Sequence, residues 1–238
     1  MKQVLRRIRR IDKYLVRLLI LNELRHYFCF ARWQLMKHRL RFLDAKNNET
    51  PQKGIDHNYS AMKNSVAFGM HNRMTKVLYP LSSLIADHGK AKILILGPRT
   101  EDDIFLCKSL GMHNCRGLDL FTYSPLIQLG DMHEMPFPSG EFDAVVMGWV
   151  LYYSRNPIKA INEVTRVMKP GGLLAIGWAE EKTEDRANSF NSIYTAEDHT
   201  ILISQGFDVC HINNDERFLS GDRCIIARKM HKSPPQQA

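Results

Sequence analysis

The sequence predicts an α/β fold built around a mostly parallel sheet. Short, continuously apolar runs such as Ile93–Leu96 have the length and composition of strands that are buried on both faces. These runs alternate with segments of helical periodicity, and that alternation indicates βα units joined by crossovers. A chain of 238 residues is long enough for one main domain with an appendage.

The first 44 residues form a segment whose charge differs from that of the rest. Of the 33 Lys and Arg and 25 Asp and Glu in the chain, residues 1–44 hold 12 and three, a net charge of +9. The remaining residues hold 21 and 22, a net charge of −1. Apolar side chains recur there at steps of three and four residues, so we expect one or two basic amphipathic helices. A polar linker is expected at 45–56, which contains Pro51 and Gly54.

Three roles are open for residues 1–44. The segment could pack on the main domain or pair with a second copy of the chain, it could lie on an anionic membrane surface, or it could bind nucleic acid. The width of its apolar face disfavours nucleic acid. The five cysteines form no C-x-x-C pair, so we expect reduced thiols, no metal site and a cytoplasmic protein, with peripheral attachment to a membrane as an option.

Further elements follow in order along the chain. A helical stretch is expected over Tyr59–Ala86, broken near Pro80. Further strands are expected at Cys115–Leu118, Phe142–Met147, Leu173–Gly177, Phe207–Ile212 and Arg223–Ala227. Helices are expected at Asp102–Leu110, Pro157–Met168 and Ala196–Gln205, and residues 231–238 are expected to be a flexible tail.

The first two strands end in residues suited to a nucleotide-like ligand. Gly97 permits a tight turn, and Thr100 with Asp103 can cap a helix whose N-terminus favours an anion. Asp119 follows the second strand, 22 residues after Gly97, where a carboxylate can bind both hydroxyls of a ribose. An ordinary strand-turn-helix junction and a solvated aspartate are the alternatives.

Two longer stretches resemble a known family. GDMHEMPFPSGEFDAVVMGWVLYY (130–153) and NEVTRVMKPGGLLAIG (162–177) resemble class I S-adenosylmethionine (SAM) methyltransferases of the type-11 group. The resemblance extends from Ile93 to Trp178 and more loosely to Ala227. It implies a Rossmann-like, mostly parallel seven-stranded sheet with an antiparallel last strand, over a domain at 57–230.

The resemblance also implies a site. Asp131 would bind the adenine amino group and Met132 would pack on the adenine ring. The further residues expected to bind cofactor are Gly97, Arg99, Thr100, Glu101, Asp119, Leu120, Gly148 and Trp149. The candidates for a catalytic base are His133, Tyr152 and Tyr153, and the segment with Tyr59, His71 and Arg73 would cover the pocket.

The chain departs from the family pattern in two places. The glycine loop, usually D/E-x-G-x-G-x-G, runs here from Ile95 to Glu101 and keeps only Gly97. Arg99 could instead pair with the methionyl carboxylate, and Glu101 with its ammonium. Asp131 follows Asp119 by only twelve positions, so a helix that the family commonly carries there is predicted to be missing.

The predicted function is SAM-dependent methyl transfer to an unidentified acceptor. The alternative is a catalytically inactive, methyltransferase-like binding or scaffold protein, associated in one version with a membrane surface. A nicotinamide-dependent dehydrogenase would also use Gly97 and Asp119, but it does not explain the stretch from Asp131 to Tyr153.

Overall fold

A computed structural model describes residues 14–44, 55–56, 58–63, 72–179, 196–204, 206–213 and 222–230. The first 13 residues, His71, residues 45–54 of the expected linker and the expected tail lie outside this set. Ile55, at the end of the expected linker, is buried in a helical turn.

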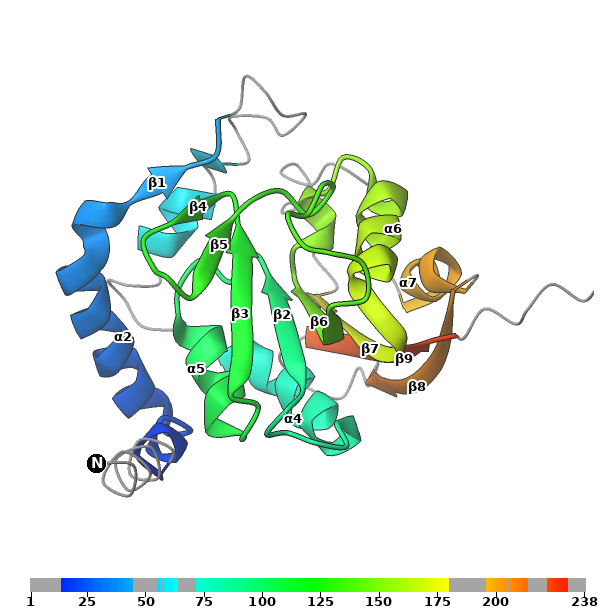
Figure 1. Ribbon diagram of the computed structural model, residues 1–238, viewed down its shortest axis with the longest axis horizontal. Helices are drawn as coiled ribbons and strands as arrows, with labels where there is room; N and C mark the ends of the chain where they lie inside the picture. The colour runs from blue at the N-terminus through cyan, green and yellow to red at the C-terminus, as the bar shows by residue number, and fades with distance from the viewer. Residues whose placement is uncertain are drawn as a thin grey trace, which may run out of the picture.

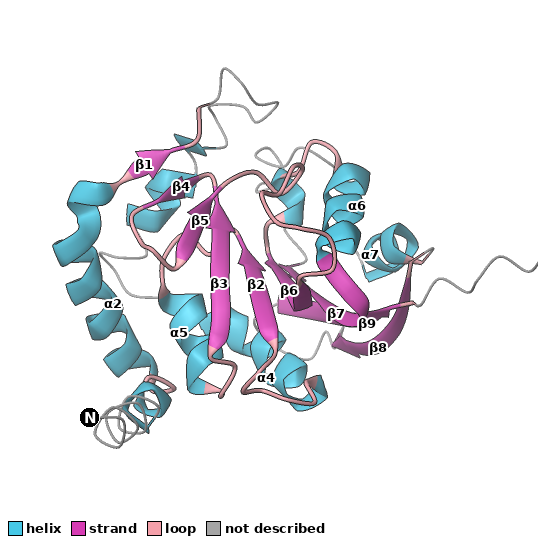
Figure 2. Ribbon diagram, viewed as in Figure 1, coloured by secondary structure: helices cyan, strands magenta, loops and turns pink. Residues whose placement is uncertain are grey.

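The core of the protein is a seven-stranded sheet (Figure 2). Its strands, in spatial order, are β5 (Ile127–Leu129), β3 (Asn114–Asp119), β2 (Lys92–Leu96), β6 (Phe142–Gly148), β7 (Met168–Ala179), β9 (Asp222–Lys229) and β8 (Phe207–Asn213). The pairings from β5 to β7 are parallel, and β9 runs antiparallel to both of its neighbours. The predicted fold class is therefore confirmed.

Helices cover both faces of this sheet. Figure 1 shows α4 (Thr75–Leu84) and α5 (Asp102–Ser109) on one side, and α6 (Pro157–Val167) and α7 (Ala196–Ile203) on the other. The central strands are apolar along their length because both faces are covered, and the side chains of Ile93–Leu96 are all buried. At the start of α6, Asn156 Oδ1 accepts a hydrogen bond from the Lys159 N–H at 2.9 Å, a side-chain cap followed by proline at the first helical position.

Two boundary predictions were wrong. The helix expected to break near Pro80 continues through it to Leu84, because Val77, Leu78 and Leu81 are fully buried and hold both turns on the sheet. The helix expected to reach Met168 ends at Val167, since Met168 is extended and already belongs to β7. Strand β7 also includes the Lys-Pro-Gly-Gly turn, with an irregular register opposite β6.

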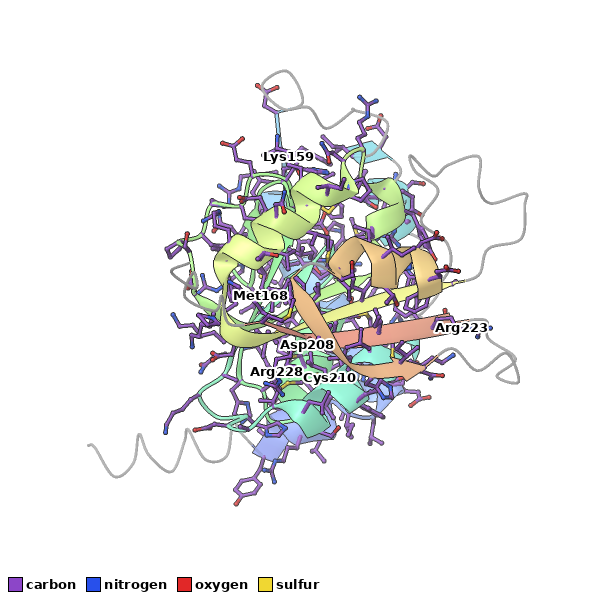
Figure 3. The ribbon with its side chains drawn as sticks, turned by 90° about the vertical axis from the view of Figure 1, so that its right-hand side faces the viewer. Lys159, Met168, Asp208, Cys210, Arg223 and Arg228 are labelled. Atoms are coloured by element: carbon purple, nitrogen blue, oxygen red, sulfur yellow. The ribbon has the colours of Figure 1, made fainter. Side chains whose placement is uncertain are left out.

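The far edge of the sheet is formed by β8 and β9. Figure 3 views this edge, with Asp208 and Cys210 on β8, and Arg223 and Arg228 on β9. Lys229 of β9 donates hydrogen bonds to the carbonyls of Thr165 and Met168, at 2.6 and 2.8 Å. The last strand is thereby tied to the end of α6.

The N-terminal segment packs on the domain through α2 (Asn22–Met36), which lies beside α5 (Figure 1). The Arg25 side chain is 1% exposed, and its Nε donates to Asp102 Oδ1 at 2.5 Å. Arg32 binds the Glu101 carboxylate through two nitrogens, at 2.5 and 2.7 Å. Because Arg25 and Arg32 are seven residues apart, they lie on the same face of the helix.

Aromatic contacts complete the attachment of α2. The rings of Phe28 and Phe105 meet edge to face at 5.0 Å between centroids, and those of Trp33 and Tyr123 at 4.7 Å. Buried Cys29 lies on the same helical face as the two arginines. The inward face of α2 therefore carries charge-paired and aromatic groups.

The chain after α2 runs beside the residues that follow β3. A turn of 3-10 helix (Lys37–Arg39) leads to β1 (Arg41–Phe42), which pairs antiparallel with β4 (Phe121–Thr122). The Leu43 N–H donates to the Leu120 carbonyl at 2.8 Å. Only a turn joins β4 to β5, so the predicted absence of a helix between Asp119 and Asp131 is confirmed.

We expect Arg25→Ala to destabilise the protein by about 3–5 kcal/mol, because it leaves the buried Asp102 carboxylate without its principal cation. Urea denaturation measures the free energy of unfolding. Arg39→Ala, which removes an exposed arginine from the same segment, is the matched control and should change stability by less than about 0.5 kcal/mol. Equal effects of the two variants would contradict the attachment of α2 described above.

Candidate functional site

Four loops meet along one edge of the sheet. Strands β5, β3, β2 and β6 are neighbours and parallel, so their carboxyl ends point the same way. Asp119 is the last residue of β3, and Asp131, Gly97 and Trp149 follow β5, β2 and β6 respectively. The structure thus gathers the predicted cofactor-binding segments at a single edge, where ligands of such sheets bind.

The loop after β2 has left-handed backbone conformations, which favour glycine, at Gly97 and at a second residue that is not glycine. Gly97 has φ of +64°, and a Cβ there would lie 2.4 Å from Cγ1 of Val150. Arg99, which replaces the second glycine of the family pattern, adopts φ of +56°. This left-handed backbone costs a non-glycine residue about 1 kcal/mol, so other contacts hold the loop in place.

Asp119 supplies such a contact. Its Oδ2 accepts a hydrogen bond from the Arg99 N–H at 2.8 Å, and its Oδ1 accepts one from the Leu120 N–H at 2.7 Å. Burial raises the pKa of Asp119 to about 6, although these hydrogen bonds and the charge of Arg99 oppose the shift. A carboxylate has about four acceptor positions, so Asp119 can serve the loop and still bind hydroxyl groups.

Two arginines and an acid surround the same loop. Burial, followed by the charge of Arg99, lowers the pKa of Arg73, so the two guanidinium groups are close enough to repel. Arg99 Nη2 donates to Asn58 Oδ1 at 3.3 Å. Burial and the charge of Asp102 raise the pKa of Asp103, and the charges of Arg73 and Arg99 oppose that rise. A pair of cations of this kind favours an anionic ligand.

Glu101, which was expected to pair with the ammonium of the cofactor, has other partners. Its carboxylate is completely buried, receives the two bonds from Arg32, and also accepts a hydrogen bond from the Ser124 hydroxyl. Thr100 is also buried, and its Oγ1 accepts from the Asp102 N–H at 3.3 Å. The predicted cap of α5 by Thr100 with Asp103 was wrong, because the N-cap residue is Glu101 and it makes no side-chain cap bond. Glu101, the last residue of the loop, therefore binds Arg32 of α2 in place of a cofactor ammonium.

Asp131 is linked to His133 and Ser154. His133 Nδ1 lies 2.5 Å from Asp131 Oδ1, which also accepts the His133 N–H at 2.8 Å. The other ring nitrogen, Nε2, lies 2.8 Å from the hydroxyl of fully buried Ser154. Burial alone would raise the pKa of Asp131, but the hydrogen bonds from His133 hold it below its ordinary value. This chain of bonds joins the loop after β5 to the loop after β6.

The end of β6 is tightly packed. A Cβ on Gly148 would lie 2.4 Å from the sulfur of Met74, so the 3-10 turn before α4 (Asn72–Met74) sits directly against this glycine. Trp149 has φ of +55°, and the Arg73 guanidinium lies 4.6 Å from the centre of its ring. Among the described residues, the buried indole Nε1 of Trp149 has no hydrogen-bond partner.

The remaining predicted residues differ in their surroundings. Met132 is half-buried and packs against the core. The Tyr152 hydroxyl is fully used within the fold, since it accepts the Ala179 N–H at 2.6 Å and donates to the Ala179 carbonyl at 2.5 Å. Tyr153 is half-buried. Of the two tyrosines, Tyr153 is therefore the better placed for chemistry.

Several of these contacts were missed by sequence reasoning. Ser154 follows the matching stretch directly, but nothing in its neighbourhood marks it as a partner of His133. Arg32 could have been identified from the sequence. The acidic run Glu101–Asp103, at the start of a buried helix, requires neighbouring cations. Arginines that are seven residues apart lie on the same face of a helix and can supply them. Within the described part of the chain, no group of three His, Cys, Asp or Glu could hold a metal ion.

Comparisons with known proteins identify methyltransferases as similar to this chain. The family model described as a methyltransferase domain matches residues 111–176. The chain is 29% identical to a demethylmenaquinone methyltransferase of Staphylococcus carnosus over 54% of its own length and 61% of that protein. A second relative of the same name, from Symbiobacterium thermophilum, is 41% identical over 54 residues, 23% of this chain and 20% of that protein.

Solved structures show the same fold. A SAM-dependent methyltransferase from Aquifex aeolicus superposes with a TM-score of 0.54 at 15% identity, covering 72% of this chain and 98% of that one. The 1,6-didemethyltoxoflavin-N1-methyltransferase of Burkholderia thailandensis, solved with bound S-adenosylhomocysteine, gives 0.53 at 14% identity, covering 81% and 95%. The resemblance to class I SAM-dependent methyltransferases of the type-11 group is therefore confirmed, and with it the Rossmann-like methyltransferase fold.

We expect Asp119→Asn to change how stability depends on pH. The folded-state pKa of about 6 lies above the ordinary 3.8, so the folded chain retains this proton longer than the unfolded one. The contribution of Asp119 is therefore fully present below about pH 4 and is lost as pH rises through 6, by on the order of 3 kcal/mol. The asparagine variant should lack this loss.

Chemical denaturation at a series of pH values measures the effect as the difference between wild type and variant. Asp208→Asn, on exposed β8, is the matched control and should run parallel to wild type. A wild-type minus Asp119→Asn difference that stays constant from pH 4 to 7 would show that Asp119 is not the titrating group.

Proposed function

We propose that this chain is a SAM-dependent methyltransferase. The observation that carries the proposal is the meeting of four loops at the carboxyl edge of β5, β3, β2 and β6, with Asp131, Asp119, Gly97 and Trp149 on them. The residues present fit this cofactor, because the site combines two carboxylates for an adenosine with two neighbouring arginines for a carboxylate. The indole Nε1 of Trp149, which has no hydrogen-bond partner within the described residues, offers a further donor.

The adenosine part would lie beside β3 and β5. Asp119 and Leu120 would contact the ribose, with the Asp119 carboxylate accepting its hydroxyl groups. Asp131 and Met132 would contact the adenine. Both hydrogen bonds from His133 fall on Oδ1 of Asp131, and this fixes the orientation of the carboxylate.

The methionyl part would lie beside the loop after β2. Arg99 would bind the carboxylate, with Arg73 adding to the positive potential there. The ammonium would be left to Asp103 rather than Glu101, because the Glu101 carboxylate is engaged by Arg32 and Ser124. Gly97 and Thr100 would shape the loop, and Gly148 and Trp149 would border the methyl group.

When bound, the cofactor supplies an electrophilic methyl group on its sulfonium. The chain contributes alignment and exclusion of water, and needs a base only for an acceptor whose proton has a high pKa. His133 and Tyr153 are the candidates for that base. With its proton on Nδ1, His133 donates to Asp131 and holds Nε2 as an acceptor, which is the form a base requires.

The acceptor is open to direct assay. The relatives from Staphylococcus carnosus and Symbiobacterium thermophilum are named for demethylmenaquinone, which makes this quinone a first compound to test. The alternative is a methyltransferase-like protein without catalytic activity. One observation favours it: the Glu101 carboxylate binds Arg32 of α2 and is therefore not available to a cofactor.

Isothermal titration of the purified chain with SAM and with NAD separates these functions. We expect SAM to bind and NAD not to bind. Asp119→Ala and Asp131→Ala should each weaken SAM binding by at least about tenfold, since each removes a charged acceptor for the adenosine. Asp208→Ala, on the far edge of the sheet, should leave it unchanged. Binding of neither ligand would favour the inactive alternative, and binding of NAD a dehydrogenase.

Two substitutions at Arg99 distinguish its charge from its backbone shape. Arg99→Ala keeps the left-handed strain and removes the guanidinium, whereas Arg99→Gly removes both. If Arg99 binds the methionyl carboxylate, both variants should lose about tenfold or more in SAM affinity. If only the loop shape matters, the glycine variant will bind as well as wild type, and the ion pair is excluded.

A further inference from the structure

The outward side of α2 is apolar. Its inward face is occupied by Arg25, Cys29 and Arg32, yet large apolar side chains also occupy the opposite side. Tyr27 is 70% exposed and Leu35 is 73% exposed. The exposed large apolar residues of the helix are Leu24, Tyr27, Phe28, Phe30 and Leu35. Exposure on this scale in one helix indicates a surface that something covers.

The apolar surface is wide. At 100° per residue, the side chains from Phe30 through Tyr27 to Leu35 span about 140° of the circumference. Phe28 lies at the border of this surface, because it also contacts Phe105. Pairing with a second helix uses a narrower stripe, of the kind that spacings of three and four residues produce. Further large apolar side chains are exposed before the helix, at Tyr14, Leu15, Leu18, Ile20 and Leu21. Within this outward arc of α2, Glu23 and Gln34 are the polar residues.

Exposed cations flank this surface at both ends. Arg17 precedes it, and Lys37, Arg39 and Arg41 follow it, all exposed. The two arginines within the helix, Arg25 and Arg32, are instead paired inward with acids of the domain. In the sequence, residues 1–13 add six Lys and Arg against one acid. An apolar centre between basic ends complements an anionic lipid surface.

We propose that α2 docks this protein on an anionic membrane, with its apolar arc at the depth of the lipid headgroups and its flanking cations on their phosphates. None of the helices among the described residues has the length and apolar character to cross a bilayer, so α2 would lie in the membrane plane. Nucleic acid is disfavoured because the centre of the surface is apolar. The proposal is independent of methyl transfer.

Co-sedimentation of the full chain with lipid vesicles tests it. We expect binding to vesicles of phosphatidylcholine mixed with phosphatidylglycerol, and about tenfold weaker binding to phosphatidylcholine alone. The triple variant Leu24→Ser, Tyr27→Ser and Leu35→Ser should bind the mixed vesicles at least about tenfold more weakly. Arg39→Gln with Arg41→Gln should lose most of the preference for the anionic lipid.

A matched control uses exposed apolar residues elsewhere. Ile158→Ser with Ile201→Ser changes α6 and α7, at 65% and 64% exposure, and should bind vesicles as wild type does. Circular dichroism and thermal melting of each variant report folding separately. The substituted side chains are exposed, so the variants should melt close to wild type.

Three results would overturn the proposal. They are absence of vesicle binding by the wild-type chain, equal binding by the triple variant, and equal loss in the α6 and α7 control. Sedimentation equilibrium without lipid completes the experiment. If the wild-type chain is a dimer, the triple variant is a monomer and neither binds vesicles, the surface is assigned to contact with a second copy of the chain.

Discussion

The attachment of α2 to α5 rests on two arginine–carboxylate pairs whose acids are buried. Glu101 and Asp102 lie at the start of a helix inside the protein, where an unpaired negative charge would be strongly unfavourable. Arg25 and Arg32 neutralise them from two successive turns of one helix face. The N-terminal helix is therefore part of the domain, since the domain alone would carry buried acids without their cations.

This pairing also explains the shape of the loop after β2. A family member with three glycines lets the backbone approach its ligand at each of those positions, whereas here the third position is an acid that faces α2. The second position, Arg99, keeps the left-handed backbone of a glycine through its N–H bond to Asp119. The loop is thus held from one side by Asp119 and from the other by Arg32.

Much of the sheet could be predicted from the sequence, because buried parallel strands leave continuous apolar runs and the stretch from Asp131 to Tyr153 carries a family pattern. The three-residue strand β5 and the pairing of β1 with β4 could not, since two or three residues contain no periodicity. Pro80 misled the helix prediction because packing outweighs a local penalty. In the site, the convergence of the four loops could be predicted from the order of strands along the chain. The partners of Glu101 and His133 could not be predicted, because pairing between side chains that are distant in sequence leaves no local pattern.

The link between Arg25 and Asp102 spans 77 residues of sequence. During synthesis the helix leaves the ribosome well before its carboxylate does, and it cannot dock until β2 and α5 have formed. Its arginines must remain hydrated throughout that interval, so closure of this long loop belongs to the late part of folding. A helix that is made early is therefore among the last to take its place.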